Sequence, residues 1–118
     1  MSSVTFKIGD HIVTQWRPGR TLKVNARLYE ATTRMRSALI VAAKRRSTLT
    51  YGELAAAIDQ LYTKRNLSRP LDLLAHDCIQ RGEPSLASLV VTKAGGEVST
   101  GFVGKAGPER ERCYEHHR

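Results

Sequence analysis

The chain has 118 residues, of which 41% are apolar and 25% charged, and it carries a formal net charge of +8. These values fit one globular domain that buries its own core. No apolar run approaches the roughly 20 residues that span a bilayer, and the N-terminus lacks the basic and apolar segments of a signal peptide. With only two cysteines, the composition excludes a membrane protein, a disulfide scaffold and a disordered tail, and we expect a cytoplasmic protein.

The excess positive charge is concentrated in one segment. Between Arg17 and Arg46 there are nine basic residues and one acid, Glu30, whereas the rest of the chain carries ten of each sign. A local positive field attracts a polyanion better than the same charge spread evenly. The segment therefore favours a nucleic-acid partner. The alternative is a solvated basic face that only aids solubility.

The N-terminal 20 residues read as extended chain. Val4, Phe6 and Ile8 alternate with polar neighbours, which is typical of a strand with one buried face. The sequence Arg-Pro-Gly-Arg at 17–20 interrupts this pattern. We expect either an N-terminal arm or a short hairpin here.

A long helix follows. Its apolar positions recur at helical spacing and fall in one stripe roughly 100° wide; they are Val24, Leu28, Ala31, Met35, Ala38, Leu39 and Ala42. Four basic residues fall together on the adjoining edge: Lys23, Arg27, Arg34 and Arg45. Such a helix would pack on a core and still present cations to a phosphate backbone. A core helix with solvated arginines fits the same pattern.

Two shorter helices are predicted next, over 51–62 and 70–81. Thr50 and Glu53 form a capping box at the start of the first, with Leu54 on its apolar face. Pro70 suits the first turn of the second helix, and Gly82 suits the left-handed position that ends it. The pair predicts a helix-turn-helix.

A β-hairpin and a short charged helix complete the chain. The run from Leu86 to Val91 predicts a strand, Gly95-Gly96 a turn, and 98–103 the returning strand. The tail 105–118 predicts a helix that packs through Cys113 and Tyr114. This order predicts a single α+β domain over 1–118, a winged helix-turn-helix with a long first helix and a C-terminal wing.

The Thr-Tyr-Gly-Glu-Leu-Ala sequence at 50–55 resembles the helix start in the DNA-binding domain of alkylguanine–DNA alkyltransferases and alkyltransferase-like proteins. The similarity covers roughly 48–104 and includes Gly-Phe-Val-Gly at 101–104. Where the family has its Pro-Cys-His-Arg motif, Ala87 stands at the cysteine position, Ser88 at the histidine and Leu89 at the arginine. The resemblance therefore implies the fold without alkyl transfer. The segment 82–102 is also similar to a group of small bacterial and phage proteins that implies no established chemistry.

Neither cysteine is expected to react. Cys78 falls on the apolar face of the third helix, and a free cysteine is usually a small buried hydrophobe. His76 with Cys78, and Cys113 with the adjacent His116 and His117, supply soft ligands, but their spacing departs from that of structural zinc sites. We therefore expect no metal and no cofactor.

The carboxylates also lack a catalytic arrangement. Asp72 and Asp77 lie five residues apart, on nearly opposite faces of a helix, whereas nuclease chemistry needs carboxylates that converge on Mg²⁺. The sequence contains no phosphate-cradling glycine loop. We expect a protein that is not an enzyme.

The expected partner is double-stranded DNA, contacted mainly at its phosphates. The candidate contact residues are Arg17, Arg20, Lys23, Arg27, Arg34, Arg45, Arg46, Lys64, Arg65, Arg69, Gln80 and Lys93. One feature opposes this expectation: the third helix carries Asp72 and Asp77 against only Arg81, and phosphates repel acids. That acidity favours the alternative, a protein-interaction module such as a phage or mobile-element protein that modulates a host protein. A homodimer also remains open.

Overall fold

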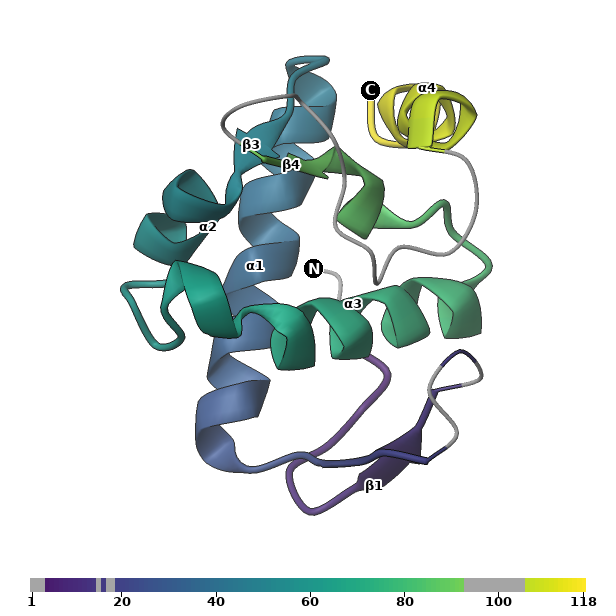
Figure 1. Cartoon of the computed structure of the whole chain (residues 1–118). Helices are drawn as coiled ribbons and strands as arrows, with labels where there is room; N and C mark the ends of the chain where they lie inside the picture. The colour runs from purple at the N-terminus through teal and green to yellow at the C-terminus, as the bar shows by residue number, and fades with distance from the viewer. Residues whose placement is uncertain (1–3, 15, 17–18, 93–105) are drawn as a thin grey trace.

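Helix α1 (Ala26–Lys44) runs through the middle of the structure, and α3 (Ser68–Arg81) crosses it (Figure 1). This computed structural model describes residues 4–14, 16, 19–92 and 106–118. The described residues form an α+β fold with four α-helices and two small two-stranded sheets. The Cα radius of gyration is 13.0 Å, which is the value expected of one folded domain of this length.

The apolar stripe of the predicted long helix is buried. Leu28, Met35 and Leu39 face the core, and the Asn25 side chain caps α1 by accepting a hydrogen bond from the Leu28 N–H at 2.8 Å. The helix begins later than its stripe predicted. Val24 is buried but precedes α1, and Lys23 belongs to a strand rather than to the helix edge.

The N-terminal segment forms an antiparallel strand pair, β1 (His11–Val13) with β2 (Thr21–Lys23). The sequence predicted that the extended N-terminal region ends at residue 20. The second strand, however, begins after it, at Thr21. Val4, Phe6 and Ile8 alternate in sequence, but their side chains do not share one buried face. Phe6 is 3% exposed and Ile8 59%, because the chain turns at Gly9, whose φ is +101°.

The capping box at Thr50 is confirmed: its hydroxyl accepts from the Glu53 N–H at 3.1 Å, and the Glu53 carboxylate accepts from the Thr50 N–H at 2.8 Å. Helix α2 (Tyr51–Ala57) is nevertheless shorter than the predicted 51–62. It ends early because Asp59 and Gln60 both adopt left-handed backbone, with φ of 56°.

Helix α3 (Ser68–Arg81) agrees with the prediction: Pro70 lies in its first turn, and Gly82 ends it with φ of 70°. Its apolar face differs in one position. Ile79, which follows Cys78 on the helix, is exposed, whereas Asp72 and Asp77 are buried.

The segment after α3 is a 3₁₀ helix, η2 (Leu86–Leu89), where a strand was predicted. Only β4 (Val90–Val91) is strand, and it pairs in parallel with β3 (Leu49–Thr50). The predicted turn at 95–96 and the returning strand at 98–103 lie outside the described residues. Helix α4 (Ala106–His116) buries Cys113 and Tyr114 as predicted.

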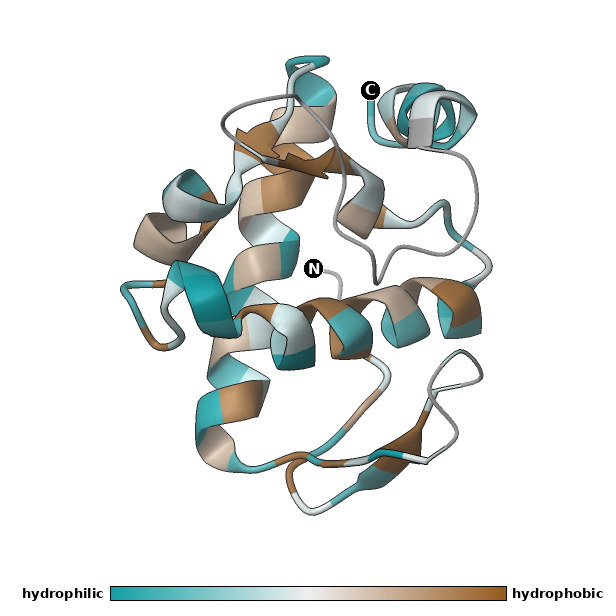
Figure 2. Ribbon diagram, viewed as in Figure 1, coloured by the Kyte–Doolittle hydropathy of each residue, from teal (hydrophilic) through white to brown (hydrophobic). Residues whose placement is uncertain are grey.

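One core joins these elements. In Figure 2 the β3–β4 pair is strongly hydrophobic and α4 is mostly hydrophilic. The largest fully buried side chains come from segments spread between β2 and η2: Leu22, Val24, Leu28, Met35, Leu39, Leu54, Ile58, Leu67, Leu73, Leu74, Leu86 and Leu89. Among the described residues, no helix is both long enough and apolar enough to cross a membrane.

Candidate nucleic-acid interface

Exposed cations gather where the start of α1 meets the connection from α2 to α3. Arg27 lies in the first turn of α1, and its Nε donates to the Leu61 carbonyl oxygen at 2.6 Å. Its guanidinium also lies over the Tyr62 ring, 4.2 Å from the ring centroid, where a cation is attracted to the π face. Arg27 therefore holds the start of α1 against the chain that leads into the connection.

The connection presents its own cations outward. Lys64 and Arg65 lie in the short 3₁₀ helix η1 (Lys64–Asn66) and are exposed. Tyr62 before this helix and Leu67 after it are buried, so the exposed turn is anchored at both ends. We call the exposed cations of this region the basic patch: Lys23, Arg27, Lys64, Arg65 and Arg69.

Other predicted contact residues already pair with acids. Arg34 pairs with Glu30 at 3.0 Å, and Arg46 with Glu111 at 2.8 Å. These pairs are exposed, and exposed ion pairs contribute only about 0–1 kcal/mol, so both arginines are available for exchange onto a phosphate. Arg20 differs, because it is half-buried and pairs with the buried Asp72 at 3.6 Å.

The remaining candidates are scattered. Arg45 is exposed at the end of α1, far from the patch along a helix about 28 Å long. Arg17 and Lys93 lie outside the described residues. Gln80 lies on α3 and lines a cavity of about 250 Å³ beside the N-terminal segment.

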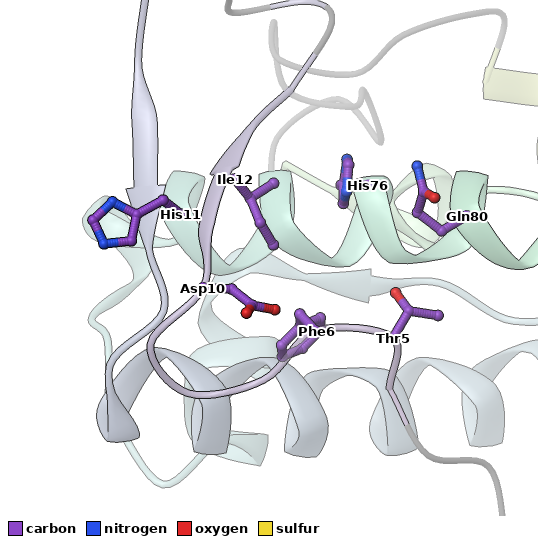
Figure 3. A pocket seen from close by; sticks show the side chains of 7 residues that line it. All are labelled: Thr5, Phe6, Asp10, His11, Ile12, His76 and Gln80. Atoms are coloured by element: carbon purple, nitrogen blue, oxygen red, sulfur yellow. The ribbon is translucent and has the colours of Figure 1, made fainter.

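That cavity changes the expected role of α3. Figure 3 shows His76 and Gln80 on α3 beside Thr5, Phe6 and Asp10 of the N-terminal segment. Gln80 is the one α3 residue that the sequence predicted to contact DNA. Because the N-terminal segment runs along this face, α3 is not a bare helix surface there.

The acids of α3 do not reach the surface. Asp77 is 0% exposed and accepts hydrogen bonds from the Thr5 N–H at 2.7 Å, the Thr5 hydroxyl at 2.6 Å and the Arg81 Nε at 2.9 Å. Asp72 is also buried and accepts from the Trp16 indole N–H at 3.2 Å. The sequence predicted that these acids repel DNA and so favour a protein partner. That prediction assumed exposed carboxylates and is wrong on this point, because both acids are buried.

Sequence reasoning also missed a buried cation. Arg36 was counted with the basic segment, but it is 3% exposed and pairs with Glu83 at 2.9 Å and with Asp77 at 3.8 Å. Its charge is offset by these two acids inside the fold and adds little to the surface field. A signal was present, because Leu28, Thr32 and Arg36 recur every four residues along one side of α1.

Both thiols are buried and protonated. Burial is the main cause that raises the pKa of Cys78 and of Cys113 to about 11. The Cys113 Sγ donates to the Ser85 carbonyl oxygen at 3.2 Å and lies 3.8 Å from the Ser88 hydroxyl. Since the thiolate is the nucleophile, neither sulfur is activated at neutral pH.

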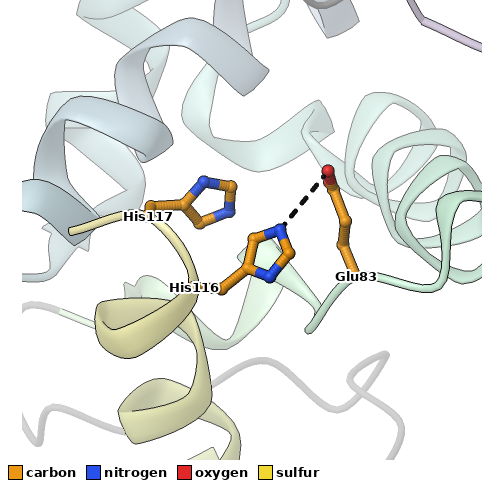
Figure 4. A group of neighbouring side chains, drawn as sticks. All are labelled: Glu83, His116 and His117. Carbon is orange, nitrogen blue, oxygen red and sulfur yellow. Dashed lines mark ion pairs between the residues drawn. The ribbon is translucent and has the colours of Figure 1, made fainter.

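A second polar cluster joins Glu83 to His116 and His117 (Figure 4). The His116 Nε2 lies 3.6 Å from a Glu83 carboxylate oxygen. Burial, followed by the neighbouring His116, lowers the pKa of His117, which keeps this ring neutral. The sequence grouped these histidines with Cys113 instead, because Glu83 lies 33 residues away along the chain.

Comparisons with protein-family models, with curated proteins and with solved structures found no match to this chain.

Proposed function

We propose that this chain is a non-enzymatic, winged helix-turn-helix DNA-binding protein that grips the phosphate backbone through its basic patch. The observation that carries the proposal is the contact of Arg27 with Leu61 and Tyr62, because it brings cations of α1 and of the α2–α3 connection together. Within the described part of the chain, none of the five patch residues forms an ion pair with an acid. None of them therefore has to break an ion pair to contact a phosphate.

The order of elements supports the winged helix. Helix α1, strand β3, helices α2 and α3 and strand β4 follow one another, and the predicted hairpin would come next. The burial of Asp72 and Asp77 removes the acids that would have faced a polyanion. Arg34 on α1 and Arg45 and Arg46 just after it are also exposed. A duplex lying along this helix would therefore meet further cations beyond the patch, although Arg34 and Arg46 would exchange an acid for a phosphate.

Binding of this kind is mainly independent of sequence and depends steeply on salt. Each phosphate neutralised releases counterions, so the logarithm of the binding constant falls by about 0.9 per contact for each unit of log salt concentration. Four contacts predict a loss of about 10²-fold in affinity between 50 and 200 mM salt.

The test is fluorescence anisotropy of a labelled random 30-mer duplex, titrated at several salt concentrations. The variant Lys64→Gln/Arg65→Gln removes two patch cations. Its matched control, Arg112→Gln/Arg118→Gln, removes the same charge from exposed positions of the C-terminal segment. The patch variant should flatten the salt slope by about 1.8, and it should do so equally for unrelated duplex sequences.

The control variant should lose only the small part of affinity that reflects net charge. Equal losses in the two variants would show that the overall charge, and not the patch, attracts DNA. An absence of binding by the wild-type protein at low salt would overturn the proposal altogether.

The second candidate is a protein-interaction module. Ile79 is a large apolar side chain of α3 that remains exposed, and an exposed apolar side chain can contact another protein when it belongs to a larger apolar patch. The variant Ile79→Ser separates the two functions. It should leave DNA affinity unchanged while weakening the affinity for a protein partner that contacts Ile79.

A further inference from the structure

We propose that Glu83, His116 and His117 form a binding site for a divalent transition-metal ion of the zinc class, where the end of α3 meets the end of α4. The three residues each offer one ligand atom, and these atoms all lie within 4.8 Å of one another. Figure 4 shows the three side chains gathered between the two elements. This site is independent of the DNA contacts proposed above.

The spacing is close to that of a bound site. With zinc bonds of about 2.0–2.1 Å in a tetrahedral arrangement, ligand atoms lie about 3.4 Å apart. The His116 Nε2 and the Glu83 carboxylate oxygen are already 3.6 Å apart. His116 is exposed and is the last residue of α4, so a small side-chain rotation completes the geometry.

An unsatisfied nitrogen points to the same conclusion. The His117 Nε2 is buried and has no hydrogen-bond partner within the described residues, although buried polar atoms are nearly always satisfied. An ion pair between His116 and Glu83 would explain their contact but would leave this nitrogen unpaired. A metal ion bound to all three residues satisfies it.

The backbone places the ligands rigidly. The Glu83 N–H donates to the Cys78 carbonyl oxygen at 2.9 Å, just past the left-handed Gly82 that ends α3. The His117 N–H donates to the Cys113 carbonyl oxygen at 3.0 Å at the end of α4. Both ligand sets therefore lie at helix carboxyl ends, where the partial negative charge favours a cation.

Arg36 supplies the outer contact of the site. Its Nη2 lies 2.9 Å from one Glu83 carboxylate oxygen and 3.2 Å from the other, which fixes the carboxylate. Asp77 lies 3.8 Å from the same guanidinium and offsets its charge. Carboxylates that ligate metals are commonly held by such partners, and these partners orient them.

The donor set selects the metal. Two imidazole nitrogens and one carboxylate oxygen suit Zn²⁺ and leave a fourth position open to water. Ni²⁺, Cu²⁺ and Co²⁺ accept the same donors. Cys113 is not part of the set, because its sulfur is engaged with the Ser85 carbonyl oxygen. A bound metal would tie α4 to the end of α3 and raise the melting temperature.

The test is calorimetric titration of the metal-free protein with zinc chloride, together with thermal unfolding with and without the metal. The wild-type protein should bind one equivalent and melt at a higher temperature. His116→Gln and His117→Gln should each lose at least the roughly 10–100-fold in affinity that follows removal of an outer-shell partner. The control is His11→Gln, which changes an exposed histidine of β1 and should bind like the wild type.

A cobalt titration identifies the ligands. Co²⁺ should compete with Zn²⁺ and show ligand-field bands without a thiolate-to-metal charge-transfer band. The metal-free His116→Gln variant should unfold at the same temperature as the metal-free wild type, which shows that it folds. The proposal fails if the wild type shows no saturable binding, if His116→Gln binds as tightly, or if a thiolate band places a cysteine in the site.

Discussion

Arg36 and Asp77 show how single buried charges organise this protein. A guanidinium that is 3% exposed would be costly alone, but Glu83 and Asp77 surround it at 2.9 and 3.8 Å. Asp77 in turn binds Thr5 of the N-terminal segment and Arg81 of its own helix. One carboxylate therefore connects three separate parts of the chain.

Removing this carboxylate should be strongly destabilising. Asp77→Ala leaves Arg36 buried with one partner fewer and leaves Thr5 without its acceptor, so we expect the free energy of unfolding to fall by about 3–5 kcal/mol. Urea denaturation, monitored by circular dichroism, measures this loss of free energy. Glu111→Ala is the control, because it removes an exposed partner of Arg46 and should cost at most about 1 kcal/mol. A similar small loss for Asp77→Ala would mean that the buried network contributes little.

At the scale of elements, the capping signals at helix ends were reliable, whereas the length and type of some elements were not. The capping box at Thr50 and the left-handed stop at Gly82 depend on neighbouring residues, and both are where the sequence predicted them. The end of α2 was not predictable, because Asp59 and Gln60 adopt a conformation that usually signals glycine. The 3₁₀ helix η2 was read as strand because its apolar run matches either structure.

Some residues of the candidate sites could be placed from the sequence, and others could not. Lys64 and Arg65 were predicted as contact residues, and they are exposed, because a polar turn between helices faces solvent. Arg36 could not be placed inside, since its partners Asp77 and Glu83 lie 41 and 47 residues further along the chain. Glu83 and His116 are also far apart, by 33 residues, so their pairing was not predictable either. Charge counted along a sequence therefore overstates the charge on the surface.

The cap of α2 offers a controlled test at this scale. Thr50→Ala removes the hydroxyl that accepts from the Glu53 N–H, so we expect a loss of about 0.5–2 kcal/mol in the free energy of unfolding. Thr63→Ala is the matched control: Thr63 has nearly the same backbone angles, but its side chain caps no helix. Thermal and urea unfolding of both variants measure the difference. Equal losses would contradict a capping role.

At the scale of the whole molecule, the N-terminal segment is part of the domain. Phe6 is buried in the main core and meets the Tyr29 ring edge-on, with centroids 5.6 Å apart. The Gly9 N–H donates to the Val24 carbonyl oxygen at 2.7 Å, and the Val24 N–H to the Asp10 carbonyl oxygen at 2.9 Å. The segment is fixed by packing and by backbone hydrogen bonds rather than hanging as a free arm.

Two substitutions in this segment should therefore have very different effects on the free energy of unfolding. Phe6→Ala should cost about 3–5 kcal/mol in the free energy of unfolding, since it empties a core position. Ile8→Ala, at a side chain that is 59% exposed, should change it by no more than about 0.5 kcal/mol. Urea unfolding measures both. A small loss for Phe6→Ala would place the segment outside the cooperative core.

The burial of Arg36 also has a consequence for the order of folding during synthesis. The face of α1 that carries Leu28, Met35 and Arg36 cannot be sealed until Asp77 and Glu83 have left the ribosome. Until then Arg36 keeps its hydration, and α1 remains an undocked helix with its apolar stripe open. Contacts between such distant positions form slowly. The nascent chain is thus most exposed to aggregation while its most basic segment is already outside, and that charge would keep neighbouring chains apart.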